Sequence, residues 1–220
     1  MSINKKISIL KSKLIESIFL LGNVIGKFSK LFWPPNLFYL NIVFKEGIFT
    51  GRNKGRFGSF GEGSRLSSNM LLVHPEYVYV GKRCHFSPHV IIEMNTIDED
   101  IPILQIGDSC SFGEFTHITS CNNIIIGEGT LTGRFVLITD NSHGSSSKDE
   151  INVPPLERKN FSRGGVKIGK NVWLGDKVTI LPNVEIGDNS IIGANSVVSR
   201  SIPSNVVAAG CPAKILKYLT

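Results

Sequence analysis

His143 is the residue of this 220-residue chain whose type and surroundings best suit proton-transfer chemistry. It stands in the stretch TDNSHG, where a long polar segment begins that matches neither of the regions flanking it. The unperturbed pKa of histidine is about 6.5, so much of the imidazole is neutral near pH 7 and can accept a proton. We therefore interpret His143 as a candidate general base. A surface loop histidine would be the default interpretation without the regular sequence around it.

The region that must position His143 is built on a six-residue repeat. An aliphatic or aromatic residue followed by glycine recurs with this period, interrupted by insertions, and the pairs begin at Val80, Ile106, Phe112, Ile126, Ile168, Leu174, Ile186 and Ile192. Six residues are too few for a helix pair or a hairpin, but they fit one short strand and its corner. Three units make one triangular coil, and stacked coils pair strand on strand. The sequence therefore predicts an all-β stack of parallel strands.

The register of the repeat predicts two columns of side chains that point into the stack, because such strands bury one face in a narrow prism. The first column holds Val80, Phe86, Ile92, Ile106, Phe112, Ile118, Ile126, Thr132, Ile138, Ile168, Leu174, Ile180, Ile186, Ile192 and Val198. The second column lies four residues further on and holds Cys84, Val90, Cys110, Thr116, Thr130, Val136, Val172, Val178, Val184, Ser190, Ser196 and Ile202.

Three insertions interrupt the register: residues 98–105, two residues at the corner 121–125, and the long segment 140–167. Long loops on regular scaffolds usually shape a site, and a straight prism has no pocket of its own. We therefore expect the inserted loop 140–167 to build a pocket around His143. A surface elaboration or a subunit contact is the alternative interpretation of this loop.

The first 45 residues differ from the repeat region. Apolar residues recur at helical spacing, at Ile7, Leu10, Leu14, Ile18, Leu21, Ile25, Phe28 and Phe32, and several lysines lie among them. We predict an amphipathic basic helix that ends at FWPPN, with too short an apolar stretch to span a bilayer. A membrane-surface anchor and a helix packed across a subunit interface are both open. We divide the chain into this helical extension, residues 1–45, and a β-helix domain, residues 46–220, with a C-terminal tail.

Composition sets broad limits on the class of protein. The formal net charge is +6 and the pI is about 9.2, which favours an anionic partner without choosing between cofactor phosphates, a membrane surface and nucleic acid. We expect no nucleic-acid partner. The four cysteines form no CxxC pair and follow no cleavable signal peptide, so we interpret them as reduced thiols of a cytoplasmic protein.

Three further residues are candidates for binding a substrate beside His143. Asp140 and Asn141 are near it in sequence and can orient the histidine or contact the acceptor. His117 has the same position within its unit as His143, but one coil earlier and one prism side away. One side is about 20 Å long, so His117 and His143 of one chain cannot touch, and a shared site would need two subunits. A histidine buried in a subunit interface is the alternative interpretation of His117.

The stretch IGKNVWLGDKVTILPNVEIGDNSIIGANSVVSRSIPSNVVAAGCPAKI resembles the hexapeptide-repeat acyltransferases, in particular the galactoside, maltose, xenobiotic and polysaccharide O-acetyltransferases. The resemblance covers roughly Phe60 to Leu219. It implies a left-handed parallel β-helix, whose handedness the period alone does not reveal. It also implies a homotrimer with active sites between subunits, and acetyl-CoA as the acetyl donor, with no metal required.

The resemblance implies roles for particular residues. His143 matches the family's catalytic histidine, and Trp173 matches a tryptophan beside the acetyl end of the cofactor. The cofactor carries a pyrophosphate and a 3′-phosphate, so the groove that binds it needs cationic side chains as well as small residues. Ala194, Ser199 and Arg200 match the pantetheine and phosphate path, Lys214 and Lys217 match the nucleotide end, and His117, Asp140 and Asn141 remain the acceptor-site candidates. Arg200 replaces what is commonly lysine in the family.

Two rivals come from other classes. A γ-type carbonic anhydrase shares this fold and a similar PAK tail, but it needs three converging zinc-binding histidines. The pair His85 and His89 is one residue short of that family's spacing, and we expect no metal site. A non-catalytic β-helix scaffold would need neither His143 nor Trp173.

The acceptor is the least determined feature. We predict acetyl transfer to a sugar hydroxyl, in surface polysaccharide synthesis such as capsule or O-antigen. The basic N-terminal helix would suit a lipid-linked glycan at the inner face of the membrane. N-acetylation of an amino sugar and acetylation of an antibiotic remain the alternatives, although no G-x-G-x-x-G nucleotide-binding motif follows a strand in this sequence.

Overall fold

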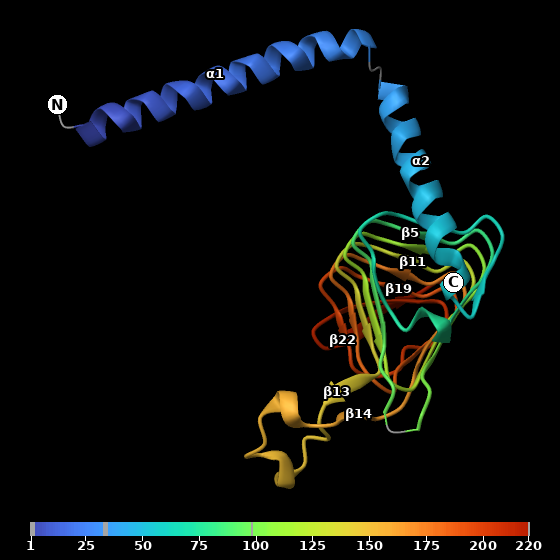
Figure 1. Ribbon diagram of the computed structural model, residues 1–220. Coiled ribbons are helices and arrows are strands. Elements are labelled where there is room, and N and C mark those ends of the chain that lie inside the picture. The colour runs from blue at the N-terminus through green and yellow to red at the C-terminus, as the bar shows by residue number, and fades with distance from the viewer. Residues whose placement is uncertain (1–2, 33–34, 98, 220) are drawn as a thin grey trace. The chain divides into compact units, whose positions relative to one another are not determined.

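The computed structural model describes residues 3–32, 35–97 and 99–219 (Figure 1). For residues 3–10, 12, 30–32 and 35–38 it describes the backbone alone. Trp33 and Pro34, within the segment predicted to end the N-terminal helix, lie outside the described residues. The chain divides into two compact units, residues 1–45 and 46–220.

Two helices precede the β-strands. Helix α1 (Ile3–Phe32) ends at the predicted stop, but the chain then forms a second helix, α2 (Pro35–Asn53), which the sequence analysis did not anticipate. Proline is tolerated in the first turn of a helix, where its missing N–H has no intrahelical partner to lose. The expected boundary at residue 45 therefore falls inside α2. A short 3₁₀ turn, η1 (Lys54–Arg56), leads into the strands.

Three parallel sheets form the sides of the prism (Figure 1). The first face holds β1 (Ser59–Phe60), β4 (Val78–Val80), β7 (Ile103–Ile106), β10 (Asn123–Ile126), β15 (Val166–Ile168) and β18 (Glu185–Ile186). The second face holds β2 (Arg65–Leu66), β5 (His85–Phe86), β8 (Ser111–Phe112), β11 (Leu131–Thr132), β16 (Trp173–Leu174), β19 (Ile191–Ile192), β21 (Val206–Gly210) and the antiparallel β22 (Ala213–Tyr218). The third face holds β3 (Leu71–Val73), β6 (Ile91–Met94), β9 (His117–Ser120), β12 (Leu137–Thr139), β17 (Thr179–Ile180) and β20 (Val197–Val198).

Successive strands of a face are one coil apart in sequence, as the repeat predicts. Leu131 of β11 pairs with Trp173 of β16, and Leu137 of β12 pairs with Thr179 of β17. The prediction of a left-handed parallel β-helix with a helical extension and a loop leaving one coil is confirmed. A further 3₁₀ turn, η2 (Pro75–Tyr77), lies between β3 and β4.

Both predicted columns form the core, since every residue assigned to them is buried. Phe86 and Phe112 stack in successive coils, with ring centroids 4.8 Å apart. Thr132, the polar member of the first column, satisfies its hydroxyl by accepting from the N–H of Gly113 at 2.9 Å and bonding Thr116 Oγ1 at 3.0 Å. A buried hydroxyl is tolerated there because it has partners.

Glycine closes the corners because adjacent coils approach each other closely. A Cβ atom added at Gly127 would lie 2.5 Å from the carbonyl carbon of Gly169 in the next coil. No larger residue fits at this contact without moving the backbone of one coil, which explains why glycine follows the aliphatic residue of the repeat.

The end of α2 covers the first coil. Thr50 Oγ1 accepts from the N–H of Leu66 at 2.9 Å, and Glu46 accepts from Ser67 Oγ at 2.5 Å. These bonds satisfy backbone and side-chain groups at the edge of the second face, which would otherwise be open to pairing with another chain.

Candidate active site

The loop that carries His143 begins at a buried aspartate. Asp140 follows β12, is fully buried, and accepts hydrogen bonds from Ser120 Oγ (2.6 Å) and from the backbone N–H groups of Cys121 (2.8 Å) and Asn122 (3.1 Å). Its carboxylate therefore caps the corner of the preceding coil. Charge-assisted bonds of this kind are the strong ones, so the base of the loop is held rigidly. Asp140 was predicted as an acceptor-site residue, but its oxygens are occupied by the chain itself.

A two-stranded ribbon follows this corner. Strand β13 (Asn141–His143) pairs antiparallel with β14 (Asn160–Ser162), with Asn141 opposite Ser162 and His143 opposite Asn160. Side chains directly opposite each other in such a ladder point to the same side, and alternate residues along a strand do as well. His143, Asn160, Asn141 and Ser162 therefore share one side of the ribbon.

The rest of the loop is ordered by its own hydrogen bonds. It contains the 3₁₀ turns η3 (Lys148–Glu150) and η4 (Pro155–Glu157). The backbone N–H and the hydroxyl of Ser145 bond the carboxylate of Glu150 and hold the pKa of that carboxyl below its ordinary value. Gly144 has a φ of 86°, and a Cβ there would lie 2.8 Å from a Glu150 oxygen. The positive φ therefore favours glycine at the position after His143.

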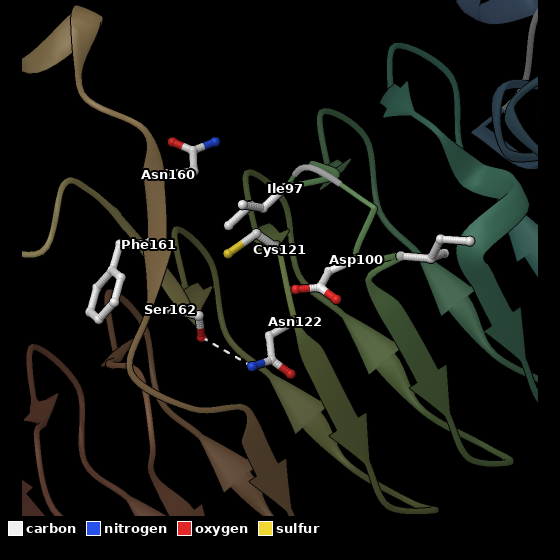
Figure 2. A pocket seen from close by; sticks show the side chains of 8 residues that line it. Ile97, Asp100, Cys121, Asn122, Asn160, Phe161 and Ser162 are labelled. Carbon is white, nitrogen blue, oxygen red and sulfur yellow. Dashed lines mark hydrogen bonds between the residues drawn. The ribbon is translucent and has the colours of Figure 1, made fainter.

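A cavity of about 420 Å³ lies against β14; its lining includes Asn160, the residue opposite His143, but not His143 itself. Figure 2 shows Asn160 and Ser162 on the side of β14 that faces Cys121 and Asn122, with Phe161 on the opposite side. Asn122 Nδ2 donates to Ser162 Oγ at 3.4 Å and joins the loop to the corner. The cavity is lined by Ile97, Asp100, Ile101, Cys121, Asn122, Asn160, Phe161 and Ser162. All three insertions of the repeat thus contribute to one pocket.

The lining combines amides, a hydroxyl, a carboxylate and aliphatic surface. This mixture suits a polyhydroxylated ligand with apolar C–H faces, because each hydroxyl needs a donor or acceptor and the ring needs an apolar contact. Cys121 is buried at its edge, and burial together with the nearby Asp140 raises the pKa of its thiol to about 12. This cysteine is therefore a neutral wall of the pocket rather than a nucleophile.

The ring of His143 is exposed, and the hydrogen bonds found across residues 3–32, 35–97 and 99–219 include none from it. Exposure leaves the imidazole accessible to a ligand or to another copy of the chain. Asn141 is tied down, since its Nδ2 donates to Thr119 Oγ1 at 3.1 Å. The structure thus brings Asp140, Asn141 and His143 together at one corner, between the third and first faces.

His117 lies elsewhere, on the outward side of the third face. Its Nε2 is 3.0 Å from Glu93 Oε2 of the preceding coil, and both side chains are about one third exposed. Like His143, it is not among the residues that line the cavity beside β14. A carboxylate that holds one ring nitrogen fixes the orientation of a histidine, so Glu93 orients the ring of His117 outside this cavity.

The residues expected to contact the cofactor fall into separate groups. Trp173 and Ala194 line one cavity of about 370 Å³ on the second face, together with Gly175, Asp176, Ile191, Ile192 and Gly193. Its lining is largely apolar, and the Trp173 ring is 50% exposed. Ser199 and Arg200 follow β20 at the corner between the third and first faces, the corner from which the His143 loop leaves two coils earlier.

Lys214 and Lys217 lie on β22, at the end of the second face, where they pair with Ala209 and Val207 of β21. Both are exposed. In one chain, therefore, the group of His143, Ser199 and Arg200 and the group of Trp173 and Ala194 are separated by the width of the third face.

Sequence reasoning missed the pocket residues Asp100, Asn122, Asn160 and Ser162. Asn160 is far from His143 in sequence, and only the register of the ribbon places the two side by side. One indication was present: a loop that leaves and re-enters the coil at one corner must bring its two ends together.

The chain has clear relatives among known proteins. Residues 165–200 match the family model "Bacterial transferase hexapeptide (six repeats)". A protein of Escherichia coli strain K12 named as the lipopolysaccharide biosynthesis O-acetyl transferase WbbJ is 41% identical over 119 residues, which are 52% of this chain and 60% of that relative. The galactoside O-acetyltransferase of the same strain is 38% identical over 115 residues, which are 50% of this chain and 57% of that relative. The chain therefore spans less than two thirds of the length of these relatives.

The fold is also that of a solved structure. The N-acyltransferase AntD from Bacillus cereus, in complex with dTDP and 3-hydroxybutyryl-CoA, has a TM-score of 0.65 and 18% sequence identity, over 78% of this chain and 88% of that one. Repeat, sequence relatives and fold agree. The resemblance to the hexapeptide-repeat acyltransferases is confirmed, and residues 165–200 carry the bacterial transferase hexapeptide repeat.

Proposed function

We propose that this protein is an acetyl-CoA-dependent O-acetyltransferase that acts on a sugar hydroxyl, with His143 as the general base. The observation that carries the proposal is the shared side of the ribbon: His143 lies opposite Asn160, and Asn160 lines the cavity of about 420 Å³ with amide, hydroxyl and carboxylate groups. A sugar held there would present its hydroxyls towards the imidazole.

The task of His143 is to move one proton. A neutral imidazole accepts the proton of the acceptor hydroxyl as that oxygen attacks the carbonyl carbon of the thioester. The carbon–sulfur bond then breaks, and the same ring nitrogen returns the proton to the departing sulfur. General base catalysis of this kind contributes about 10²–10⁴-fold. Asp140 acts on this step only through position, because its hydrogen bonds fix the corner from which β13 starts.

Acetyl-CoA would supply an acetyl group already activated as a thioester. The residues present fit such a donor: the cavity beside Trp173 and Ala194 is largely apolar, as suits a pantetheine arm. Arg200, Lys214 and Lys217 are exposed cations suited to its phosphates. Ser199 lies next to Arg200 and would hydrogen-bond the part of acetyl-CoA between its pantetheine arm and its phosphates. The CoA thioester bound by AntD and the names of the curated relatives support this choice.

We propose a homotrimer with the site between copies. The corner that carries His143 and Arg200 and the face that carries Trp173 lie apart in one chain, so a complete site needs the corner of one copy against the second face of the next. Such head-to-tail contacts close into a ring when the rotation is one third of a turn. His117 and Asn141 would then bind or orient the acceptor near the junction.

The name of WbbJ favours surface polysaccharide as the acceptor class, and we place the reaction in the cytoplasm, where acetyl-CoA is made. N-acylation of an amino sugar is the second candidate, favoured by the fold of AntD. The two differ in the atom that attacks, so a matched pair of acceptors separates them.

The test is acetyl-CoA consumption, read as free thiol release, across methyl glycosides of hexoses, 6-deoxyhexoses and their amino-sugar counterparts. Wild type is compared with His143→Ala and with His74→Ala. His74 is a control because it lies in a different coil from His143, where its ring pairs with Glu76. Acceptor-dependent release that is lost in His143→Ala and kept in His74→Ala supports the proposal. Equal release from all three proteins would remove His143 from its role.

A further inference from the structure

Helix α1 exposes an apolar surface that no part of the catalytic proposal uses. Leu14, Ile18, Leu21, Ile25 and Phe28 are spaced by three or four residues and form one side of the helix. Their side chains are 59–65% exposed. Exposed apolar surface of this extent marks an interaction site.

The apolar surface is wider than one stripe. Ile15, Phe19 and Leu20 flank it and are 63–71% exposed. A helix that packs in a bundle needs an apolar stripe of about 100°, with polar residues on the remaining circumference. Here the polar side is narrow and includes Glu16, Asn23 and Lys27, which lie opposite Leu14 at helical spacing.

The net charge of this helix is strongly positive. Residues 3–32 contain six lysines and one glutamate. Contacts between copies of the helix would bring lysines towards lysines, whereas anionic headgroups would neutralise them. Neither described helix combines the length and the apolar character that crossing a membrane requires.

We propose that α1 lies along the surface of a bilayer that contains anionic phospholipids, with its apolar side at the boundary of headgroups and acyl chains and its lysines among the headgroups. The surface fits lipid better than protein because a bilayer accepts a wide apolar arc without shape complementarity. This inference does not depend on the catalytic proposal, since it concerns residues outside the candidate active site.

The test is flotation of the full chain with vesicles of phosphatidylcholine alone or with 30% phosphatidylglycerol, at low and high salt. We expect binding to the phosphatidylglycerol vesicles that falls as salt rises. Neutralising Lys11, Lys13 and Lys27 to glutamine should reduce partitioning by about fivefold per lysine. The matched control neutralises three exposed lysines of the β-helix, Lys82, Lys170 and Lys177, and should bind as wild type.

A second variant tests the apolar side without breaking the helix. The double substitution Ile18→Ala and Ile25→Ala places alanine, a strong helix former, at both positions. The circular dichroism spectrum should therefore be unchanged while vesicle binding is lost. Equal binding by the α1 lysine variant and its control would overturn the proposal. The proposal would also be overturned if wild type did not bind vesicles and light scattering showed a changed oligomer mass for the alanine variant. That result would assign α1 to contacts between copies.

Discussion

The carboxylate of Asp140 accepts a hydrogen bond of 2.6 Å from the hydroxyl of Ser120, one coil earlier in the stack. This bond joins the first residue of the inserted loop to the rigid part of the prism. It ties the position of His143 to the core, because β13 begins at Asn141, directly after Asp140, and ends at His143.

The first prediction concerns this buried carboxylate. Asp140→Asn replaces one acceptor oxygen with a donor that faces other donors, so we expect the free energy of unfolding to fall by about 1–3 kcal/mol. We also expect kcat to fall while the KM for acetyl-CoA is unchanged, since only the His143 corner moves. Urea denaturation and steady-state kinetics measure both. Asp149→Asn, exposed in the same loop, is the control, and matching behaviour of the two variants would contradict the positioning role.

The second prediction tests the division of the site between copies. His143→Ala and Trp173→Ala should each be inactive alone. Co-expressed with different tags and purified as mixed trimers, they should regain about one third of wild-type activity, because one of the three sites then takes an intact residue from each of two neighbours. Inactive mixed trimers would show instead that one chain supplies both residues.

The third prediction assigns the pocket beside His143 to the acceptor. Asn160→Ala removes an amide from its wall and should raise the KM of the best glycoside severalfold, with the KM for acetyl-CoA unchanged. Asn195→Ala at an exposed corner is the control. If Asn160→Ala altered only the KM for acetyl-CoA, the pocket would belong to the donor.

The fourth prediction follows from the raised pKa of Cys121. With a pKa of about 12 against an ordinary value of 9.0, the folded protein keeps this thiol protonated where the unfolded chain loses the proton. Stability from this group is therefore complete below pH 9 and falls as pH rises from about 9 to 12. Iodoacetamide at pH 8 should modify the exposed Cys211 and leave Cys121 intact, as peptide mass spectrometry would reveal. Rapid modification of Cys121 in the folded protein would contradict its burial.

The fifth prediction concerns the contact between coils. Gly127→Ala places a methyl group 2.5 Å from the backbone of Gly169, and overpacking of this kind costs about 1–3 kcal/mol. Gly55→Ala is the matched control, because a Cβ there has no neighbour within 4 Å. Thermal unfolding should separate the two variants by several degrees. Identical melting temperatures would mean that the coils are less closely packed than described.

Much of the fold could be predicted from the sequence because a β-helix has local rules. Thr132 and Ile138 are buried as the register requires, and the loop leaves the stack at the predicted corner. Helix α2 was not predicted, since the proline that stops one helix can also begin the next. His143 and Trp173 were identified by resemblance, and their catalytic roles stay predictions.

The six-residue register, the buried columns and the place of His143 at the mouth of the long loop follow from the amino-acid sequence, because a strict period repeats the same environment in every coil. The folded structure was needed to reveal that Asp140 is buried as a structural cap, that Asn160 lies opposite His143, and that Trp173 and Arg200 lie on different sides of the prism. These relationships join residues distant in the chain through strand pairing and corner geometry. No local pattern encodes them, since they depend on where the loop returns to the stack.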